Sequence, residues 1–153
     1  MQAKDVMTTK VVTVKKDTTV EDIVDLLLTH RISGVPVVNE QNHVIGVVTE
    51  GDLLFKKRLP TSIDWVQMYG PYLRPEELVK EHRKTKGLKA EDIMTPKPIC
   101  VNENTPVVEI AKLMLQKGIK RVFVLRNDTL VGVVSRGDIL KDLVKTQKEE
   151  KQK

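Results

Sequence analysis

The stretch Gly46-Val47-Val48-Thr49-Glu50-Gly51-Asp52 decides the fold, because the chain repeats it as Gly132-Val133-Val134-Ser135-Arg136-Gly137-Asp138. Further upstream, Asp5-Val6-Met7-Thr8 recurs as Asp92-Ile93-Met94-Thr95, at an offset of 87 residues. When that offset is held and one residue is dropped, about 19 of roughly 49 aligned positions are identical, where chance gives about three. The chain therefore consists of two copies of one unit.

Each copy predicts the element order β-α-β-β-α, so we expect an α/β (α+β) fold. A short β-branched run opens each copy, at residues 11–14 and 99–101, and is typical of a strand. Thr18 and Glu21 have the spacing of a capping box, and the apolar residues that follow keep helical spacing. We expect hairpin strands at 35–38 and 44–49 and at 122–125 and 130–135, each hairpin being followed by a helix that begins near Gly51 or Gly137.

The repeat divides the chain into four segments: copy one (1–57), an insert (58–87), copy two (88–144) and a charged tail (145–153). The insert contains Trp65, Tyr69 and Tyr72, and a short helix is expected from Pro75 onward. Its aromatic residues suit a linker that plugs a groove in the fold. A partner surface and a lid over a ligand are the alternatives.

The composition of the chain is that of a folded protein without membrane spans. Of its 153 residues, 40% are hydrophobic and 31% are charged. The single cysteine, Cys100, excludes an internal disulfide framework. No apolar run approaches the roughly 20 residues that cross a bilayer, and the first residues lack the apolar stretch of a signal peptide. We therefore expect a soluble, cytoplasmic protein.

The sequence carries no signature of an enzyme, a metal site or a nucleic-acid interface. His30, His43 and His82 are far apart along the chain, and neither a Walker loop nor a nucleophile elbow is present. The net charge of +5 is spread over the whole chain, and aromatic residues for base stacking amount to 3%. We expect no catalysis and no metal, and nucleic-acid binding is disfavoured.

Thr49-x-x-Asp52 and Ser135-x-x-Asp138 each stand where a strand turns into a helix. The structural interpretation is a capping box that satisfies the first N–H groups of the helix. The functional interpretation uses the same geometry, because a helix N-terminus suits a phosphate group and a carboxylate can accept hydrogen bonds from a ribose diol. The residues alone leave both interpretations open.

Three motifs in the same order, twice over, carry a family resemblance: Asp-Val-Met-Thr, Ser33-Gly34-Val35-Pro36-Val37-Val38 and Gly-Val-Val-Thr/Ser-x-Gly-Asp. They resemble the cystathionine β-synthase (CBS) domain family, and the tandem arrangement is similar to a CBS pair, or Bateman module. The resemblance covers both copies, about two thirds of the chain. It implies two repeats packed as a pseudo-two-fold pair, with adenosine-containing ligands in the clefts between them.

The resemblance also assigns ligand-binding roles to individual residues. Asp52 and Asp138 take the ribose role, and Thr49 and Ser135 contact the ribose or the first phosphate. The base pocket is expected at the start of the middle strand of each copy, with two residues of the first strands nearby, although most of these side chains are also expected in the core. These residues are Ile32, Val35, Pro36, Ile119, Val122 and Phe123, with Thr13 and Cys100 nearby.

The two copies differ in charge around these motifs. Copy two has Lys120 and Arg121 where copy one has Ser33 and Gly34, and it has Arg136 where copy one has Glu50. In nucleotide-binding members of the family, basic residues at the start of this strand hold phosphates. The cleft that carries the three cations is therefore predicted to bind a phosphorylated ligand more tightly. Since family clefts draw on both repeats, Lys120 and Arg121 can also serve the cleft of Asp52.

The resemblance thus predicts a stand-alone regulatory module without a catalytic cofactor. Its ligand is an adenosyl compound (AMP, ADP, ATP, S-adenosylmethionine or NAD), and it signals to a regulated partner protein that the sequence does not identify. A homodimer is expected, because the helix at Ile23–Leu28 is apolar over a wide face. The alternatives are a nucleic-acid-binding protein on the same scaffold and a structural dimerisation module with empty clefts.

Overall fold

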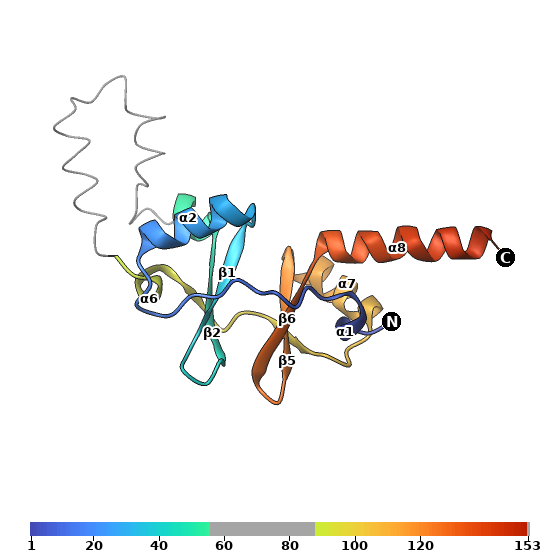
Figure 1. Ribbon diagram of the computed structural model, residues 1–153, viewed down its shortest axis with the longest axis horizontal. Helices are drawn as coiled ribbons and strands as arrows, with labels where there is room; N and C mark the ends of the chain where they lie inside the picture. Colours follow the sequence, from blue (N-terminus) through green and yellow to red (C-terminus); the bar gives the residue numbers. More distant parts are fainter. Residues whose placement is uncertain (56–87, 153) are drawn as a thin grey trace, which may run out of the picture. The chain divides into compact units, whose positions relative to one another are not determined.

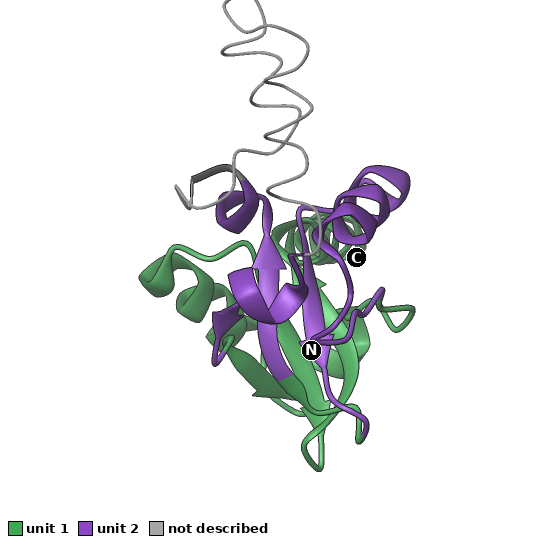
Figure 2. Cartoon of the chain, turned by 90° about the vertical axis from the view of Figure 1, so that its left-hand side faces the viewer, with its two compact units in different colours: residues 1–11, 41–44, 98–153 green, residues 12–40, 45–97 purple. Residues whose placement is uncertain are grey.

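The computed structural model describes residues 1–55 and 88–152. It divides into two compact units, which Figure 2 shows in different colours. Unit 1 comprises Met1–Val11, Gln41–Val44 and Pro98–Lys153, and unit 2 comprises Val12–Glu40 and Ile45–Lys97. The helix and the aromatic residues expected in segment 58–87 lie outside the described residues.

Unit 2 is built on a three-stranded sheet of order β1-β2-β3, in which the short strand β3 runs antiparallel to β2. Strands β1 and β2 are labelled in Figure 1. The first long helix of the unit, α2, packs against β1. Strand β2 and the two-residue strand β3 are joined by the pairs Gly46–Pro96 and Val47–Thr95. The elements are α2 (Val20–His30), β1 (Gly34–Val38), β2 (Val44–Thr49), α3 (Glu50–Phe55), α6 (Ala90–Ile93) and β3 (Thr95–Pro96).

Unit 1 repeats this plan with a sheet of order β4-β5-β6. Strand β4 is parallel to β5, and β5 forms an antiparallel hairpin with β6. The order β-α-β-β-α and the α/β class are thereby confirmed in copy two. The elements are α1 (Ala3–Val6), β4 (Cys100–Asn102), α7 (Val107–Lys117), β5 (Arg121–Arg126), β6 (Thr129–Ser135) and α8 (Arg136–Lys151).

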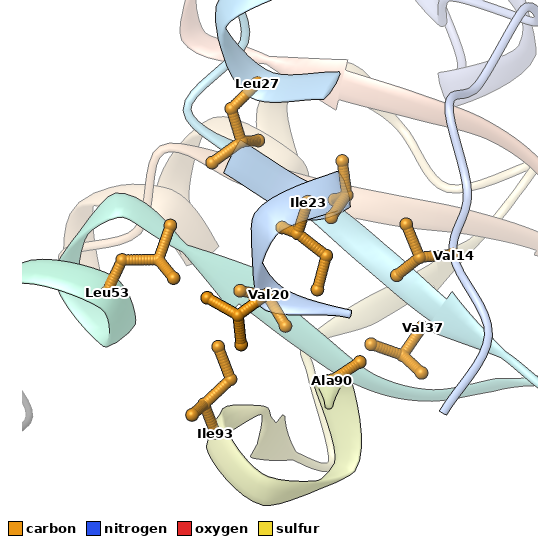
Figure 3. Packing of buried hydrophobic residues seen from close by; sticks show 10 residues of the cluster. Val14, Val20, Ile23, Leu27, Val37, Leu53, Ala90 and Ile93 are labelled. Atoms are coloured by element: carbon orange, nitrogen blue, oxygen red, sulfur yellow. The ribbon is translucent and has the colours of Figure 1, made fainter. Parts of the chain in front are cut away.

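Each unit has its own hydrophobic core, formed by one face of a helix and the inner face of the sheet. In unit 2, α2 buries Val20, Ile23 and Leu27, which recur at helical spacing (Figure 3). In unit 1, α7 buries the corresponding Val107, Ile110 and Met114. The strands add short β-branched residues to both cores, such as Val35, Val37, Val48, Val122, Val124 and Val134.

The beginning of copy one differs from the sequence-based expectation. Residues 11–14 form no strand, and only Val14 makes a parallel bridge, to Val37. The N-cap of α2 is Thr19, whose hydroxyl accepts a hydrogen bond from the Asp22 N–H at 3.2 Å. Thr18 instead accepts the Lys15 N–H at 3.0 Å, so it closes the turn that precedes the helix. The predicted capping box of Thr18 and Glu21 is therefore wrong by one residue.

The first segment of each copy packs in the unit formed mainly by the other copy. The Ala3 N–H donates to the Thr105 carbonyl at 2.8 Å, and the Ala90 N–H donates to the Thr18 carbonyl at 2.8 Å. Both alanines are fully buried. The sequence copies and the compact units are thus different divisions of the chain, since the two copies exchange their N-terminal segments.

This exchange explains why the second strand of each hairpin contains a glycine, which is Gly46 in β2 and Gly132 in β6. A Cβ atom on Gly46 would lie 2.5 Å from Met94 Sδ, and one on Gly132 would lie 2.5 Å from Met7 Sδ. The Met side chain of each exchanged segment thus lies directly on the backbone of the opposite hairpin. Only glycine leaves room for this contact.

Helix α8 continues through most of the charged tail to Lys151, alongside α7 and α1 (Figure 1). None of its residues is buried, and Leu140, Leu143 and Val144 are more than half exposed. Within the described part of the chain, no helix has both the length and the apolar character required to cross a membrane.

Candidate functional site

The turn between β6 and α8 in unit 1 holds the carboxylate of Asp138 at a helix N-terminus. The Ser135 N–H donates to Asp138 Oδ2 at 2.9 Å, and the Ser135 hydroxyl donates to the same oxygen at 3.1 Å. In return, the Asp138 N–H donates to Ser135 Oγ at 3.3 Å. The expected capping box is therefore present. Asp138 Oδ1 accepts no hydrogen bond from any residue that the structure describes, and the side chain is half-buried.

The backbone of the three basic residues predicted from the sequence adjoins this turn. The Arg136 side chain folds back toward the start of β5, where its Nε donates to the Ile119 carbonyl at 3.3 Å. The Arg136 N–H donates to the Lys120 carbonyl at 3.1 Å. Arg121 pairs with Ser135 across the hairpin. The three cations therefore lie on backbone that adjoins the Asp138 turn, within one unit.

The equivalent turn in unit 2 has the same backbone and a more enclosed carboxylate. The Thr49 N–H donates to Asp52 Oδ2 at 2.9 Å, the Thr49 hydroxyl donates to that oxygen at 3.2 Å, and the Asp52 N–H donates to Thr49 Oγ1 at 3.2 Å. In addition, the Thr95 hydroxyl donates to Asp52 Oδ1 at 2.8 Å. Asp52 is 6% exposed, so this carboxylate is buried.

At the positions that match Lys120, Arg121 and Arg136, the Asp52 turn has Ser33, Gly34 and Glu50. The Glu50 N–H donates to the Ser33 carbonyl at 2.9 Å, which matches the bond from Arg136 to Lys120. At these matched positions the side chains are an acid and a hydroxyl instead of two bases. A phosphate group near the Asp52 turn would therefore meet a negative charge at Glu50.

The apolar residues predicted for the base pocket are mainly core residues. Val35, Pro36, Val122 and Phe123 are at most 2% exposed. Ile32 and Ile119 are half-buried and precede the first residue of β1 and β5, respectively, so they border the two turns. Of the six residues, the two isoleucines retain accessible surface for a ligand.

The two first-strand residues lie apart from the turns. Thr13 is exposed next to Val14. Cys100 pairs with Phe123 across β4 and β5, and its thiol donates to the Pro98 carbonyl at 3.5 Å. Burial raises the pKa of the Cys100 thiol, which keeps it protonated. Its side chain faces a hollow of ~490 Å³ between β4 and α7, lined by Cys100, Val101, Asn102, Thr105, Glu109, Lys112, Leu113 and Gln116.

Sequence reasoning missed Thr95 as a residue of the Asp52 turn. Thr95 was visible only as part of the repeated Asp-Ile-Met-Thr motif, 43 residues away from Asp52. It reaches the turn because β3 pairs with β2. In residues 1–55 and 88–152, no three His, Cys, Asp or Glu side chains are grouped as a metal site would require.

Comparison with known proteins places these turns in a family context. The CBS domain family model matches residues 3–58 and 90–145, so it covers both copies and most of the described residues. Both candidate turns lie within the matched ranges.

Relatives and solved structures agree with this match. The uncharacterized protein MJ1426 of Methanocaldococcus jannaschii is 29% identical over 94% of this chain and 92% of its own length. The chloroplastic CBS domain-containing protein CBSX1 of Arabidopsis thaliana is 32% identical over 84% of this chain and 57% of its own length. The CBS-pair protein CBSX2 of Arabidopsis thaliana, in a structure with AMP, is 29% identical with a TM-score of 0.73, over 95% of this chain and 98% of that chain.

Proposed function

The chain belongs to the CBS domain family, and on that premise we propose that it is a regulatory module that binds an adenosine-containing ligand. The proposed ligand is a phosphorylated one, and AMP is the first candidate. Binding without turnover is the proposed activity, with a change in the module transmitted to a partner protein. The single observation that carries this proposal is the Asp138 turn with its adjoining bases.

The Asp138 turn offers each group that a nucleoside monophosphate requires. Asp138 Oδ1 faces no donor among the described residues, so it can accept a ribose hydroxyl. The guanidinium groups of Arg121 and Arg136 and the ammonium of Lys120 suit a phosphate. Ile119 provides half-buried apolar surface beside them for a base.

The AMP complex of CBSX2 supports the choice of ligand. That protein shares the fold and 29% of its residues with this chain. The regulated partner is proposed only as a class: a protein that contacts the module differently in its ligand-bound and ligand-free states.

We also propose that the module forms a homodimer. Leu28 of α2 and Leu115 of α7 occupy equivalent positions in the two copies, and they are 65% and 82% exposed. A large apolar residue exposed at the same helix position in both copies favours a shared contact face for a second chain. Light scattering should give twice the 17.4 kDa chain mass, and changing both leucines to Lys should return the monomer mass.

Isothermal titration calorimetry tests the proposed ligand directly. The protein is titrated with AMP, adenosine, S-adenosylmethionine and a single-stranded RNA, at two salt concentrations. We expect saturable AMP binding that is tighter than adenosine binding, because adenosine lacks the phosphate that the bases contact. Ligand at 100 times its dissociation constant should also raise the stability by about 2.7 kcal/mol, which a thermal melt detects.

Asp138→Ala and Asp142→Ala form a matched pair for this experiment. Both remove a carboxylate from α8, but only Asp138 belongs to the turn. AMP binding should be strongly weakened in the first variant and unchanged in the second. RNA binding with a steep salt dependence and no nucleotide binding would favour the nucleic-acid alternative instead. No binding of any of these compounds would favour a purely structural module.

A further inference from the structure

The carboxylates of Asp52 and Asp138 differ in the hydrogen bonding of their Oδ1 atoms. Asp52 Oδ1 accepts the Thr95 hydroxyl at 2.8 Å, whereas Asp138 Oδ1 accepts no donor from the described residues. The equivalent of Thr95 in unit 1 is Thr8, whose backbone pairs with Val133 in the same antiparallel manner. The Thr8 hydroxyl, however, makes no hydrogen bond within the described part of the chain. A threonine hydroxyl therefore binds the aspartate carboxylate in unit 2, whereas Thr8 and Asp138 form no such bond in the described part of unit 1.

The hydrogen bond from Thr95 leaves the Asp52 carboxylate few acceptor positions for a ligand. A carboxylate that binds a ribose diol presents acceptor positions to two neighbouring hydroxyl groups. Asp52 already receives three hydrogen bonds from Thr49 and Thr95, and it is buried. A carboxylate has about four acceptor positions, so a ribose diol, which offers two hydroxyl groups, could bind Asp52 fully only by replacing the Thr95 hydroxyl, a group of the same chemistry. Thr95 thus competes with a ligand from within the chain.

We propose that the Thr95 hydroxyl closes the Asp52 turn to ribose, so that the chain binds one adenosyl ligand, at the Asp138 turn, until Thr95 is displaced. This inference rests on the proposed function, because it specifies which of the two turns is in use. It makes Thr95 a positioning residue that acts through Asp52. Because Thr95 is the first residue of β3, a ligand that enters the Asp52 turn must first displace a side chain of that strand.

Adenosine is the probe that isolates this effect. It has the ribose of AMP but no phosphate, so the different charges near the two turns affect its binding little. Calorimetry should give one adenosine per wild-type chain. Thr95→Val, which keeps the side-chain shape and removes the hydroxyl, should raise the stoichiometry to two. Thr95→Ser, which keeps the hydroxyl, should leave it at one.

Matched variants separate this effect from a general loosening of the fold. Thr8→Val removes the equivalent hydroxyl from unit 1 and should leave one adenosine per chain. The double variant Thr95→Val with Asp138→Ala should bind one adenosine, at the Asp52 turn, whereas Asp138→Ala alone should bind none. If Thr95→Val does not fold, Thr95→Ala removes the same hydroxyl with less crowding and provides the same measurement.

The outcomes distinguish this inference from the proposed function. Two adenosines per wild-type chain, or one per folded Thr95→Val chain, would overturn the Thr95 closure and leave nucleotide binding in place. The absence of adenosine and AMP binding in the wild type and in every variant would overturn the proposed function and, with it, this inference.

Discussion

The turns at Asp52 and Asp138 have one backbone geometry and two different surroundings. In both, a hydroxyl residue and an aspartate three positions later exchange hydrogen bonds at the start of a helix. The Asp52 carboxylate is buried and bound by Thr95, next to an acidic residue. The Asp138 carboxylate is half-buried, and basic residues adjoin it.

The comparison shows that capping and ligand binding are separable uses of one motif. Capping needs only one carboxylate oxygen, Oδ2, which accepts the N–H of Thr49 or Ser135, and both copies keep that bond. Ligand binding needs the other oxygen and the charges around it, which is where the copies differ. The motif alone therefore identifies a stable turn, and its neighbours decide whether the turn can bind a nucleotide.

The largest expected effect comes from removing each carboxylate in turn. Asp138→Ala should weaken AMP binding by about 100-fold, because about 3 kcal/mol of hydrogen bonding to a charged acceptor is lost. Asp52→Ala should leave AMP affinity within about twofold. It should instead lower the free energy of unfolding by about 1–3 kcal/mol, because the part-buried hydrogen bonds from Thr49 and Thr95 lose their acceptor. Calorimetry and urea unfolding measure the two effects, and equal losses of AMP affinity in both variants would remove the distinction between the turns.

A second pair of variants tests a contact that the two copies share, between a strand glycine and the methionine of the exchanged segment. Gly46→Ala and Gly132→Ala should each lower the free energy of unfolding by about 1–3 kcal/mol, because the new methyl group would overlap the Met94 or Met7 side chain. Gly137→Ala is the control, since its Cβ would meet only Ser135 Oγ, at 3.6 Å. Urea unfolding measures all three. A destabilisation in only one of the first two would show that the exchanged segments are not equivalent.

The charge difference between the turns should have a smaller effect on affinity. Arg136→Glu should weaken AMP binding by about tenfold, or 1.4 kcal/mol, and change adenosine binding little. Lys141→Glu makes the same charge change further along the exposed face of α8 and should have less effect. Glu50→Arg should not change AMP affinity while Thr95 closes the Asp52 turn. Unchanged AMP affinity in Arg136→Glu would show that Arg136 does not contact the phosphate.

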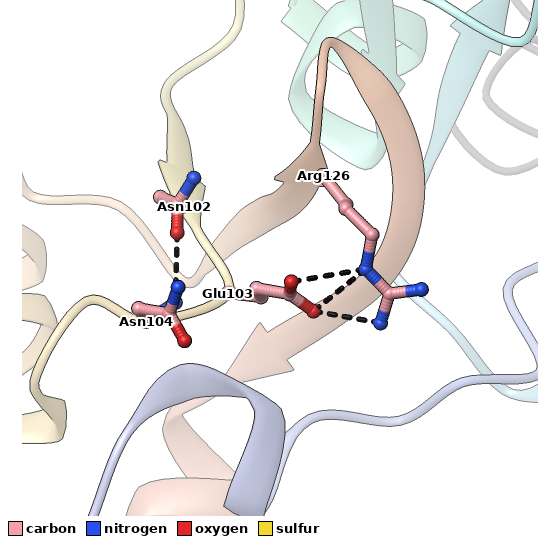
Figure 4. A network of polar contacts seen from close by, with 4 residues as sticks. All are labelled: Asn102, Glu103, Asn104 and Arg126. Carbon is pink, nitrogen blue, oxygen red and sulfur yellow. Dashed lines mark hydrogen bonds and ion pairs between the residues drawn. The ribbon is translucent and has the colours of Figure 1, made fainter.

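The smallest expected effect concerns pH and an ion pair of copy two whose two residues are not repeated at the matching positions of copy one. Arg126 Nε and Nη2 donate to the Glu103 carboxylate at 2.7–2.9 Å, as Figure 4 shows. This hydrogen bonding and charge lower the pKa of Glu103 below its ordinary value of 4.5. The stabilisation is therefore present above that value and is lost as the pH falls through the lowered pKa. At the positions of copy one that match Glu103 and Arg126, the chain has Lys16 and Asn39, and Lys15 Nζ donates to the Asn39 carbonyl at 3.0 Å.

Two variants measure this difference between the copies. Arg126→Gln should destabilise the protein slightly at pH 6, and the difference from the wild type should shrink toward pH 3. Lys15→Met should cause a difference that stays constant over the same range. Thermal melts at several pH values provide the measurement, and a constant difference for Arg126→Gln would contradict the assignment.

The fold was predictable because its signals are local. Helical spacing identified α2 and α7, and the repeated Gly-Val-Val-Thr/Ser-x-Gly-Asp stretch marked the strand-to-helix turn in both copies. The same short-range rules failed at residues 11–14. That run is β-branched, but its backbone meets the sheet only at Val14, and propensity does not reveal which strand edges have a partner.

The content of the candidate site was predictable only in part. The bases at 120, 121 and 136 were visible from the alignment of the two copies, and hydrogen bonds join their backbones near the Asp138 turn. The role of Thr95 was not visible, because it depends on a pairing between β2 and β3 across more than 40 residues of chain. Four of the six base-pocket residues are core residues, since apolar strand positions serve packing first.

The exchanged segments have a consequence for the biosynthesis of the protein. Met1–Val11 leave the ribosome well before the rest of their unit, which begins largely at Pro98. At ordinary translation rates this delay is on the order of ten seconds, during which buried residues such as Ala3 lack their binding surface. Copy one in turn lacks α6 until Ala90–Ile93 have been synthesised. Neither half can therefore mature as an independent domain during translation, and a cut between the copies would leave both halves incomplete.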